Sequence, residues 1–368
     1  MEENYFFQRT VEIIVGGKYR LLKKIGDGAF TQIFEGCDIF DNSKIAIKLE
    51  HNSIKYPQLL FESQLLKSFK GIGIPKIYWS GISGEYIVMV MELLGSNLEE
   101  LFQTCCKKFT LKTVLMICKQ IIDRIHHLHN YNYIHRDIKP QNFVIGKKEN
   151  EYLLYLVDFG LAKRYKEEYT NFHIPLRQGI KLTGTIRFAS YNAMNKKELS
   201  RRDDMESIGY LLLYFLKGSL PWQGLKIKQK NEKYDKIREM KMNLDLNKLC
   251  EGIPEEFGTY LKMVRKLEFE EEPEYVKYIN LFDDLFKRKE FIRDYNYDWL
   301  EDKKNNKKDN YKDNLMYNNY DAYNNAGNIN NLEEINNINE KNEDKNNSED
   351  KTDNKEDENK TKDNCNIY

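Results

Sequence analysis

The segment HRDIKPQN at residues 135–142 carries the strongest chemical signal in the sequence. It contains Asp137, then Lys139 two residues later and Asn142 five residues after the aspartate. A carboxylate can orient a hydroxyl group and accept its proton, and an ammonium can neutralise charge on a phosphoryl group. An amide oxygen is a ligand that Mg²⁺ accepts. The spacing therefore indicates phosphoryl transfer, with Asp137, Lys139 and Asn142 as catalytic residues.

A second acidic motif, DFG, begins at Asp158, sixteen residues after Asn142. The apolar run LLYLV precedes it, which is typical of a buried strand that fixes the aspartate at its end. Mg²⁺ prefers oxygen ligands and bridges the terminal phosphates of a nucleotide. We therefore expect Asn142 and Asp158 to bind Mg²⁺, or Mn²⁺ in its place, together with ATP.

The N-terminal part adds two weaker motifs. The turn IGDGAF carries Gly26 and Gly28, whose backbone amides could approach a phosphate without a Cβ in the way. The same turn occurs in ordinary hairpins, and Thr31 replaces the third glycine of a nucleotide-covering loop. Lys48 lies on the apolar strand KIAIKLE, and Glu62 on the following helix could pair with it. Taken alone, Lys48 could also be a surface lysine at a strand end.

These motifs follow the order glycine-rich turn, strand lysine, helix glutamate, HRD loop and DFG. That order is typical of protein kinases and is much more specific than any one motif. Histidines at 126, 127, 129 and 135 raise a zinc site as an alternative. Three of them fall on different faces of one predicted helix and the fourth belongs to the HRD loop, so the pattern favours separate roles.

The elements that must position these residues follow from periodicity. Short runs of β-branched and aromatic residues at 19–25, 33–37 and 45–50 predict an antiparallel sheet. One helix interrupts the sheet, with Pro57 in its first turn and apolar residues at near-helical spacing as far as Phe69.

Beyond Leu111 the apolar spacing becomes helical over about five turns, and it is helical again at 204–218 and 258–267. We therefore expect an α+β fold of two lobes joined near Leu94 and Gly95. The N-lobe is an antiparallel sheet with a helix, and the larger C-lobe is mostly helical.

Composition divides the chain into an N-terminal extension (1–18), a catalytic domain (19–300) and a tail (301–368). Within the domain we expect the N-lobe to cover 19–94 and the C-lobe 95–300. The tail is roughly one third Asn and holds 17 acidic and 11 basic side chains, with few large apolar residues. Such a segment buries too little surface to offset chain entropy, so we expect an acidic, disordered tail.

The formal net charge of zero gives no indication of nucleic acid binding. No apolar stretch reaches the roughly 18 residues that span a bilayer, and the six cysteines show no C-x-x-C pair. We expect a monomer with reduced thiols that binds no membrane. The expected location is the cytoplasm, with the nucleus as a second possibility.

Several further stretches resemble one protein kinase family, casein kinase 1, and the likeness covers nearly all of residues 16–299. LTGTIRFASYN at 182–192 stands where most kinases carry Ala-Pro-Glu, and VMVMELLG, LSRRDDMESIGY and GSLPWQGLK are similar to that family. The resemblance implies a serine/threonine kinase that transfers the γ-phosphate of ATP to acidic or pre-phosphorylated protein substrates. It also implies activity without phosphorylation of the activation segment.

The same resemblance implies roles for individual residues. The ATP site would contain the glycine-rich turn, the Lys48–Glu62 pair, the gatekeeper Met91, the connecting backbone and apolar walls: Ile25, Gly26, Gly28, Ile33, Ala46, Lys48, Glu62, Met91, Glu92, Leu94, Val144 and Val157. Arg187, Gln223 and Lys233 would bind a phosphate or carboxylate of the substrate.

Two other functions compete with this one. A pseudokinase or scaffold would keep the fold without turnover, although the intact Lys48, Asp137, Asn142 and Asp158 argue against it. An interaction protein would instead work through its tail. The acidic stretch SEDKTDNKEDE could also dock on the basic domain as a pseudosubstrate, a hypothesis that rests on charge alone.

Overall fold

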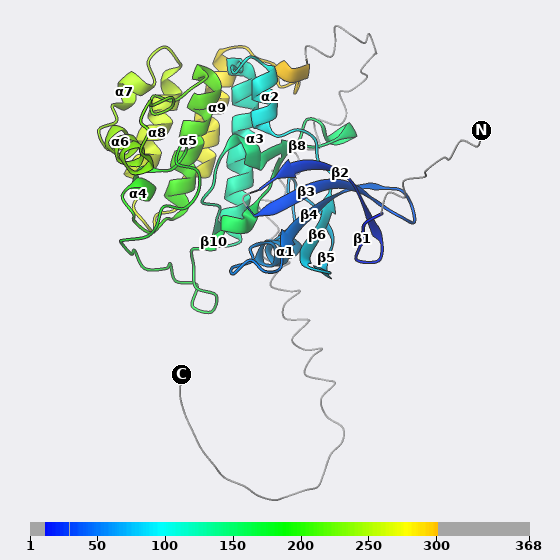
Figure 1. The fold of residues 1–368 in the computed structure, drawn as a ribbon. Helices are drawn as coiled ribbons and strands as arrows, with labels where there is room; N and C mark the ends of the chain where they lie inside the picture. The colour runs from blue at the N-terminus through cyan, green and yellow to red at the C-terminus, as the bar shows by residue number, and fades with distance from the viewer. Residues whose placement is uncertain (1–11, 29, 301–368) are drawn as a thin grey trace, which may run out of the picture. The chain divides into compact units, whose positions relative to one another are not determined.

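Six strands of the N-terminal part form one antiparallel sheet (Figure 1). The computed structural model describes residues 12–28 and 30–300, so the predicted tail lies outside the described residues. The strands are β1 (Ile14–Val15), β2 (Tyr19–Asp27), β3 (Thr31–Asp38), β4 (Lys44–His51), β5 (Ile77–Ser83) and β6 (Tyr86–Glu92), in the order β1-β2-β3-β4-β6-β5. The three predicted strands are present, each one or two residues longer at its ends than expected.

β1 lies within the segment expected as an N-terminal extension. Ile14 pairs with Arg20 and Val15 with Tyr19, so this short strand adds an edge to the sheet. Val15 is 5% exposed and packs in a cluster with Ile47 and Val88, which are fully buried. The sheet therefore buries apolar side chains of its edge strands and of its central strands. This burial holds β4, the strand that carries Lys48, in place.

Helix α1 (Leu59–Ser68) crosses the sheet and carries Glu62. The expectation that Pro57 lies in its first turn is wrong, because the helix begins two residues later. The buried carboxylate of Glu50 on β4 accepts hydrogen bonds from the amides of Gln58 (3.1 Å) and Leu59 (2.9 Å). A partner from another strand thus fixes where the helix starts, which local sequence does not reveal.

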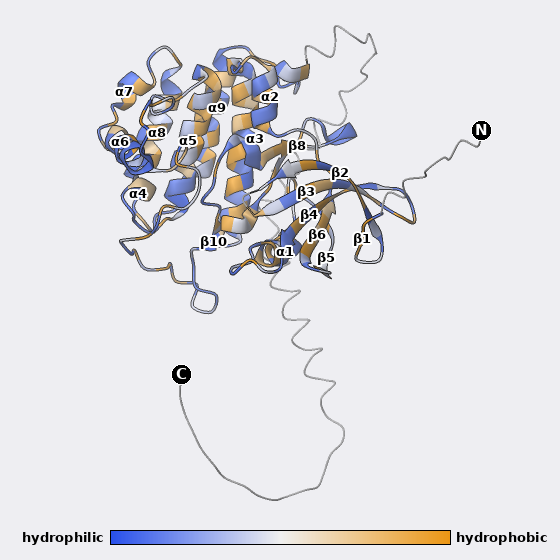
Figure 2. Ribbon diagram, viewed as in Figure 1, coloured by the Kyte–Doolittle hydropathy of each residue, from blue (hydrophilic) through white to orange (hydrophobic). Residues whose placement is uncertain are grey.

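The C-terminal part is mostly helical, as predicted. Its helices are α2 (Leu98–Thr104), α3 (Leu111–Asn130), α4 (Tyr191–Met194), α5 (Arg201–Lys217), α6 (Lys230–Met242), α7 (Leu246–Leu249), α8 (Glu255–Lys266) and α9 (Tyr275–Arg288). Long helices α3, α5 and α9 pack side by side, and Figure 2 shows α6 as largely hydrophilic in contrast to the central strands. Among the described residues, no helix combines the length and hydropathy that crossing a bilayer requires.

Two small two-stranded sheets frame the catalytic motifs. β7 (Tyr133–Ile134) pairs with β10 (Lys163–Arg164), and β8 (Phe143–Ile145) pairs with β9 (Leu154–Leu156). Two 3₁₀ turns, η1 (Pro140–Asn142) and η3 (Phe159–Leu161), follow the catalytic lysine and the DFG aspartate, and a third, η2 (Lys148–Asn150), joins β8 to β9.

Leu94 and Gly95 lie in the segment between β6 and α2, which connects the sheet to the helical part. The Gly95 amide donates to the carbonyl of Ile145 at 2.8 Å. A Cβ at Gly95 would lie 2.9 Å from the Ile145 side chain and 3.0 Å from the Gly146 carbonyl. Only glycine therefore allows the connecting strand to lie this close to β8.

Candidate active site

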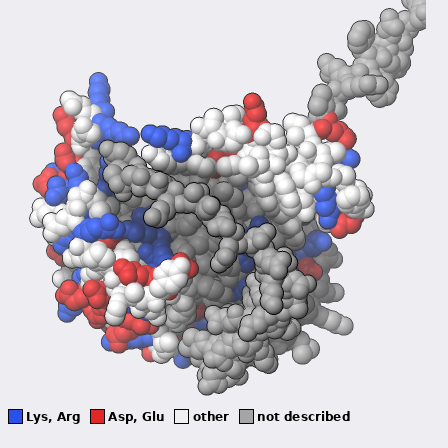
Figure 3. All heavy atoms as spheres, turned by 90° about the horizontal axis from the view of Figure 1, so that it is seen from below, with Lys and Arg blue, Asp and Glu red and all other residues white. Residues whose placement is uncertain are grey.

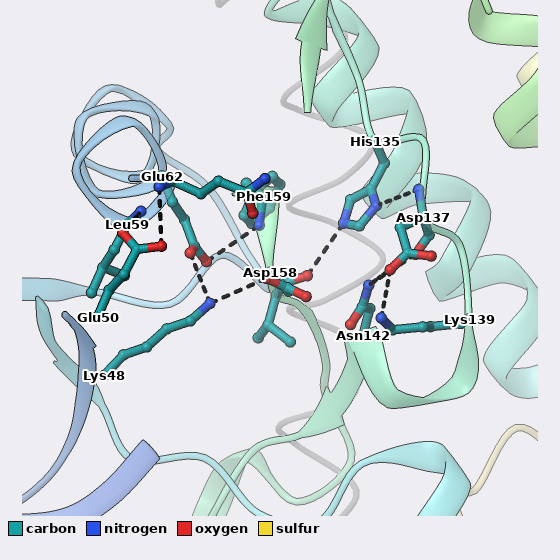
Figure 4. Close-up of polar contacts among 12 residues, drawn as sticks. Lys48, Glu50, Leu59, Glu62, His135, Asp137, Lys139, Asn142, Asp158 and Phe159 are labelled. Carbon is teal, nitrogen blue, oxygen red and sulfur yellow. Dashed lines mark hydrogen bonds and ion pairs between the residues drawn. The ribbon is translucent and has the colours of Figure 1, made fainter. Parts of the chain in front are cut away.

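Lys48, Glu62 and Asp158 meet between the lobes, although they come from a strand, a helix and a loop (Figure 4). The Lys48 Nζ lies 2.8 Å from Glu62 Oε2 and 3.1 Å from Asp158 Oδ1. The other Glu62 oxygen accepts the amide of Phe159 at 3.3 Å. The glutamate on α1 thus holds both the strand lysine and the start of the DFG segment.

Burial and charge act in opposite directions on this group. Burial alone would lower the pKa of Lys48, but the charges of Glu62 and Asp158 outweigh it and raise that pKa. Burial raises the pKa of Glu62, and Lys48 opposes that shift. Burial also works against ionisation of Asp158, but Lys48 and Lys139 lower its pKa overall. The site therefore holds an ammonium and an ionised DFG carboxylate at neutral pH.

Asp137 lies at the centre of a hydrogen-bonded loop. Its Oδ2 is 2.5 Å from the Nζ of Lys139, and its backbone carbonyl accepts Asn142 Nδ2 at 2.8 Å. Its amide donates to His135 Nδ1 at 3.3 Å, and the Nε2 of that ring contacts the Val157 carbonyl at 3.2 Å. The structure thus brings the three predicted catalytic residues together and connects them to the strand end before Asp158 (Figure 4).

Sequence reasoning missed Thr185, which also contacts Asp137. Its amide and its Oγ1 both lie 2.8 Å from Asp137 Oδ1, so two donors fix that oxygen. The neighbouring Gly184 has φ +83°, and a Cβ there would lie 2.2 Å from the Arg136 carbonyl. A motif signal was present in LTGT, because only glycine allows this turn to approach the catalytic loop.

Asp204 was also missed, and it holds the backbone of the HRD loop. Its carboxylate accepts the amides of His135 (2.7 Å) and Arg136 (2.9 Å) and lies 3.0 Å from His129 Nε2. Arg136 has φ +66°, a conformation that costs a residue with a side chain about 1–2 kcal/mol. The buried Asp204 stabilises this strained turn, which aims Asp137 toward the cleft.

Asn142 and Asp158 fit a Mg²⁺ site by their chemistry. Because Asn142 Nδ2 donates to the Asp137 carbonyl, its Oδ1 faces away from that bond. Asp158 uses Oδ1 for Lys48, and its Oδ2 makes no hydrogen bond among the described residues, while the side chain is 44% exposed. An amide oxygen and an accessible carboxylate are the hard donors that Mg²⁺ prefers.

Several of the predicted nucleotide residues lie on one face of the N-terminal sheet. Ile33 pairs with Lys48 and Ala46 with Met91 across adjacent strands, so these residues share a face of the sheet. Ile25 and Gly26 on β2, Glu92 at the end of β6, and Leu94, Val144 and Val157 beside the lobe connection complete the predicted set. The Leu94 amide makes no hydrogen bond within the described residues, which leaves it available to an adenine ring.

Thr31 changes the glycine-rich turn. The Gly28 amide donates to the Thr31 carbonyl at 2.7 Å, and a Cβ at Gly28 would lie 2.3 Å from Thr31 Oγ1. A side chain at residue 28 would therefore require the Thr31 hydroxyl to rotate away.

The three residues of the expected anion site differ in how firmly the structure connects them. Arg187 lies over the rings of Phe188 (5.6 Å) and Tyr214 (5.3 Å), and its only charged contact among the described residues is Glu99 at 4.0 Å. The Trp222 indole donates to the Arg187 carbonyl at 2.7 Å, which places the turn of Gln223 beside it. Lys233 is exposed on α6, and no contact joins it to Arg187.

The histidines make different contacts, and no group of potential metal ligands occurs within residues 12–28 and 30–300. His126 stacks on Tyr275, His127 contacts the Lys70 carbonyl at 2.7 Å, and His129 lies between Tyr275 and Asp204.

A cavity of about 480 Å³ lies on the opposite face of the sheet from Lys48. It is lined mostly by apolar residues such as Ile13, Leu22 and Phe34, with no charged side chain, so it is not the catalytic site.

Comparison with protein-family models identifies a protein kinase domain at residues 19–275. The match spans more than half of the chain and includes the strand lysine, the HRD loop and the DFG segment described above. The chain therefore belongs to the protein kinase family, whose members generally use ATP and Mg²⁺.

Proposed function

We propose that this kinase is casein kinase 1-like and transfers the γ-phosphate of ATP to Ser or Thr in acidic or pre-phosphorylated proteins. The observation that carries the proposal is the fixed Asp137 carboxylate, with Thr185 on one oxygen and Lys139 on the other. Asp137 would orient the acceptor hydroxyl and take its proton, and Lys139 would neutralise the phosphoryl charge. Mg²⁺ held by Asn142 and Asp158 would neutralise charge on the nucleotide phosphates.

The close approach of Thr185 to Asp137 favours Ser and Thr over Tyr. Residues 185–191 follow the activation segment, and Thr185 contacts the catalytic carboxylate directly. A peptide lying along this segment has its backbone near Asp137. The hydroxyl of Ser or Thr is one bond from Cβ and reaches the carboxylate there, whereas the phenol oxygen of Tyr extends a whole ring further.

Unused donors near Arg187 support recognition of an anion. The Gln223 side chain uses its oxygen to accept the Leu220 amide at 2.7 Å, which leaves its NH₂ group for a ligand. Arg187 has only a 4.0 Å contact to Glu99, and Lys233 has no charged partner among the described residues. Figure 3 shows basic and acidic side chains next to each other on one face of the molecule. Recognition of an anion would therefore depend on the donors of Arg187, Gln223 and Lys233 rather than on the charge of a whole face.

A buried carboxylate supports activity without phosphorylation of the activation segment. Glu198 is 1% exposed and lies 2.7 Å from Lys163 and 3.3 Å from Arg177. Burial lowers the pKa of Arg136, and Glu198 and Asp204 oppose this shift. Glu198 thus supplies, next to the HRD arginine, the negative charge that a phosphate supplies where activation segments are phosphorylated.

The test uses four peptides of related sequence: an acidic Ser peptide, its pre-phosphorylated form, its Tyr counterpart and a basic peptide. We expect transfer to an acidic Ser peptide, faster transfer when a phosphoserine precedes the acceptor by a few residues, and little transfer to the Tyr counterpart or a basic peptide. Arg187→Ala should remove the preference for the phosphorylated peptide, with Arg164→Ala, a half-buried arginine of the same segment that pairs with Glu168, as control. Equal rates for all four peptides would contradict the proposed specificity.

The main alternative is a pseudokinase that binds nucleotide without turnover. The Lys48, Glu62 and Asp158 contacts would serve nucleotide binding in a pseudokinase as well, so binding alone does not separate the two functions. Turnover with a folded wild type separates them.

A further inference from the structure

Lys241 on α6 is fully buried, which is unusual for a lysine, and it takes no part in the chemistry above. Its Nζ lies 3.0 Å from the Ile186 carbonyl, 3.2 Å from that of Arg187 and 2.6 Å from that of Ala189. Three carbonyls require three N–H donors, and only the ammonium form of lysine has three. One side chain thus donates hydrogen bonds to three backbone carbonyls of the segment between Thr185 and α4.

Two aromatic rings complete this environment. The ammonium lies 4.7 Å from the centre of the Trp222 ring and 5.0 Å from that of Tyr210, distances at which a cation is attracted to a ring face. The Trp222 indole donates to the Arg187 carbonyl, so this oxygen has two donors. The cation and the indole therefore fix the backbone of Arg187 from two elements.

The segment that Lys241 holds also carries the groups that face a substrate. Thr185 precedes it and binds Asp137, and the Arg187 side chain leaves it toward solvent. No backbone hydrogen bond to the carbonyls of Ile186 or Ala189 is present among the described residues. Without the ammonium this backbone would lose its main fixed contacts, whereas the nucleotide site would keep Lys48, Glu62 and Asp158.

We propose that Lys241 is a positioning residue for the protein substrate, which sets the place of Arg187 and Thr185 without contacting ATP. The proposal rests on the kinase function proposed above and names what orders its substrate-binding segment. It predicts that the KM for a peptide depends on Lys241, and that the KM for ATP does not.

The groups around Lys241 also predict a pH effect. Burial lowers the pKa of Lys241 to about 7, and Glu206 on α5 opposes this shift. The other groups near it are Tyr210, whose pKa burial raises well above its usual value, and the guanidinium groups of Arg187 and Arg265. Above pH 7 the amine therefore loses a proton and one of three carbonyls loses its donor.

The test compares Lys241→Met with Lys236→Met, which makes the same change at an exposed position of α6. We expect Lys241→Met to raise the peptide KM about tenfold or more, to leave the KM for ATP within twofold, and Lys241→Arg to recover part of the loss. Lys236→Met should match the wild type. A peptide KM within twofold of the wild type in folded Lys241→Met would overturn the proposal.

Two further measurements cover the other outcomes. If Lys241→Met does not fold, the wild type decides: its KM for an Asp-containing peptide should rise between pH 6 and pH 9, and a flat profile overturns the proposal. If the wild type transfers no phosphate, the proposed function fails, and amide hydrogen exchange of residues 185–191 is compared instead. Equal exchange in the wild type and Lys241→Met would then overturn the positioning role.

Discussion

Asp137 receives donors from two segments that are far apart in the sequence. Lys139 contacts one carboxylate oxygen at 2.5 Å, while the amide and hydroxyl of Thr185, 48 residues away, contact the other at 2.8 Å. Fixed donors hold the carboxylate in one rotamer, which shortens the search for a productive geometry with the acceptor hydroxyl. The hydroxyl of Thr185 therefore positions the carboxylate of Asp137.

Replacing Thr185 by Ala removes that hydroxyl and keeps the amide bond to Asp137. Because a hydrogen bond to a charged group contributes about 1.5 kcal/mol, we expect kcat to fall by about tenfold at an unchanged KM for ATP. Thr185→Ser keeps the hydroxyl and should retain most of the activity. Steady-state kinetics on both variants checks this prediction, and equal kcat values for Thr185→Ala and the wild type would exclude the role.

Among the elements, the activation segment contacts the buried Glu198 through Lys163 and Arg177, and we propose that this carboxylate takes the place of a phosphate. Glu198→Gln removes the charge that neutralises Lys163 and Arg177, so we expect kcat to fall by about tenfold. Glu168→Gln, on the same segment but with a side chain that is 64% exposed, should match the wild type. The measurement is kcat after phosphatase treatment. An inactive phosphatase-treated wild type would show that Glu198 does not replace a phosphate.

The contact between α3 and α9 makes stability depend on pH. Burial lowers the pKa of His126 to about 4, and its ring stacks on Tyr275 at 4.1 Å. The unfolded chain takes up a proton near pH 6.5, whereas the folded protein does so only near pH 4. Stability therefore falls as the pH decreases between these values, by about 1–2 kcal/mol for this residue at pH 5.

His126→Phe keeps the stacked ring and cannot take up a proton. We expect its melting temperature to fall less than that of the wild type between pH 7 and pH 5, by about 2–4 °C. Thermal unfolding at both pH values checks this prediction. Identical shifts in the two proteins would mean that His126 does not contribute to acid sensitivity.

The elements were predictable where apolar spacing and glycine breaks lie within one segment, as in α3 and in strands β2 to β4. The start of α1 was not, because Glu50 from a strand caps it. Lys48, Asp137 and Asp158 belong to short motifs and could be found by type and spacing. Thr185 lies in the LTGT stretch and Lys241 in no such motif, but the role of neither could be found by type and spacing, since each acts on a partner about 50 residues away.

At the scale of the whole molecule, charge is unevenly distributed. Residues 301–368 hold six more acidic than basic side chains, and the rest of the chain is positive by the same amount. Opposite charges attract over about 30 Å in 10 mM salt and over about 8 Å in 150 mM salt. If the acidic tail competes with acidic substrates, a chain ending at residue 300 should show a lower peptide KM at low salt only. Unchanged kinetics at low salt would remove this hypothesis.

The central claim is that this arrangement of residues catalyses phosphate transfer. The most direct measurement follows ³²P from ATP, with Mg²⁺, into an acidic Ser peptide and its pre-phosphorylated counterpart, for the wild type and for Asp158→Asn. We expect the wild type to transfer phosphate to both peptides, and to do so faster with the pre-phosphorylated one. A folded Asp158→Asn protein should transfer none. A wild type that labels neither peptide nor itself would show that this arrangement of residues does not catalyse phosphate transfer. It would favour a pseudokinase.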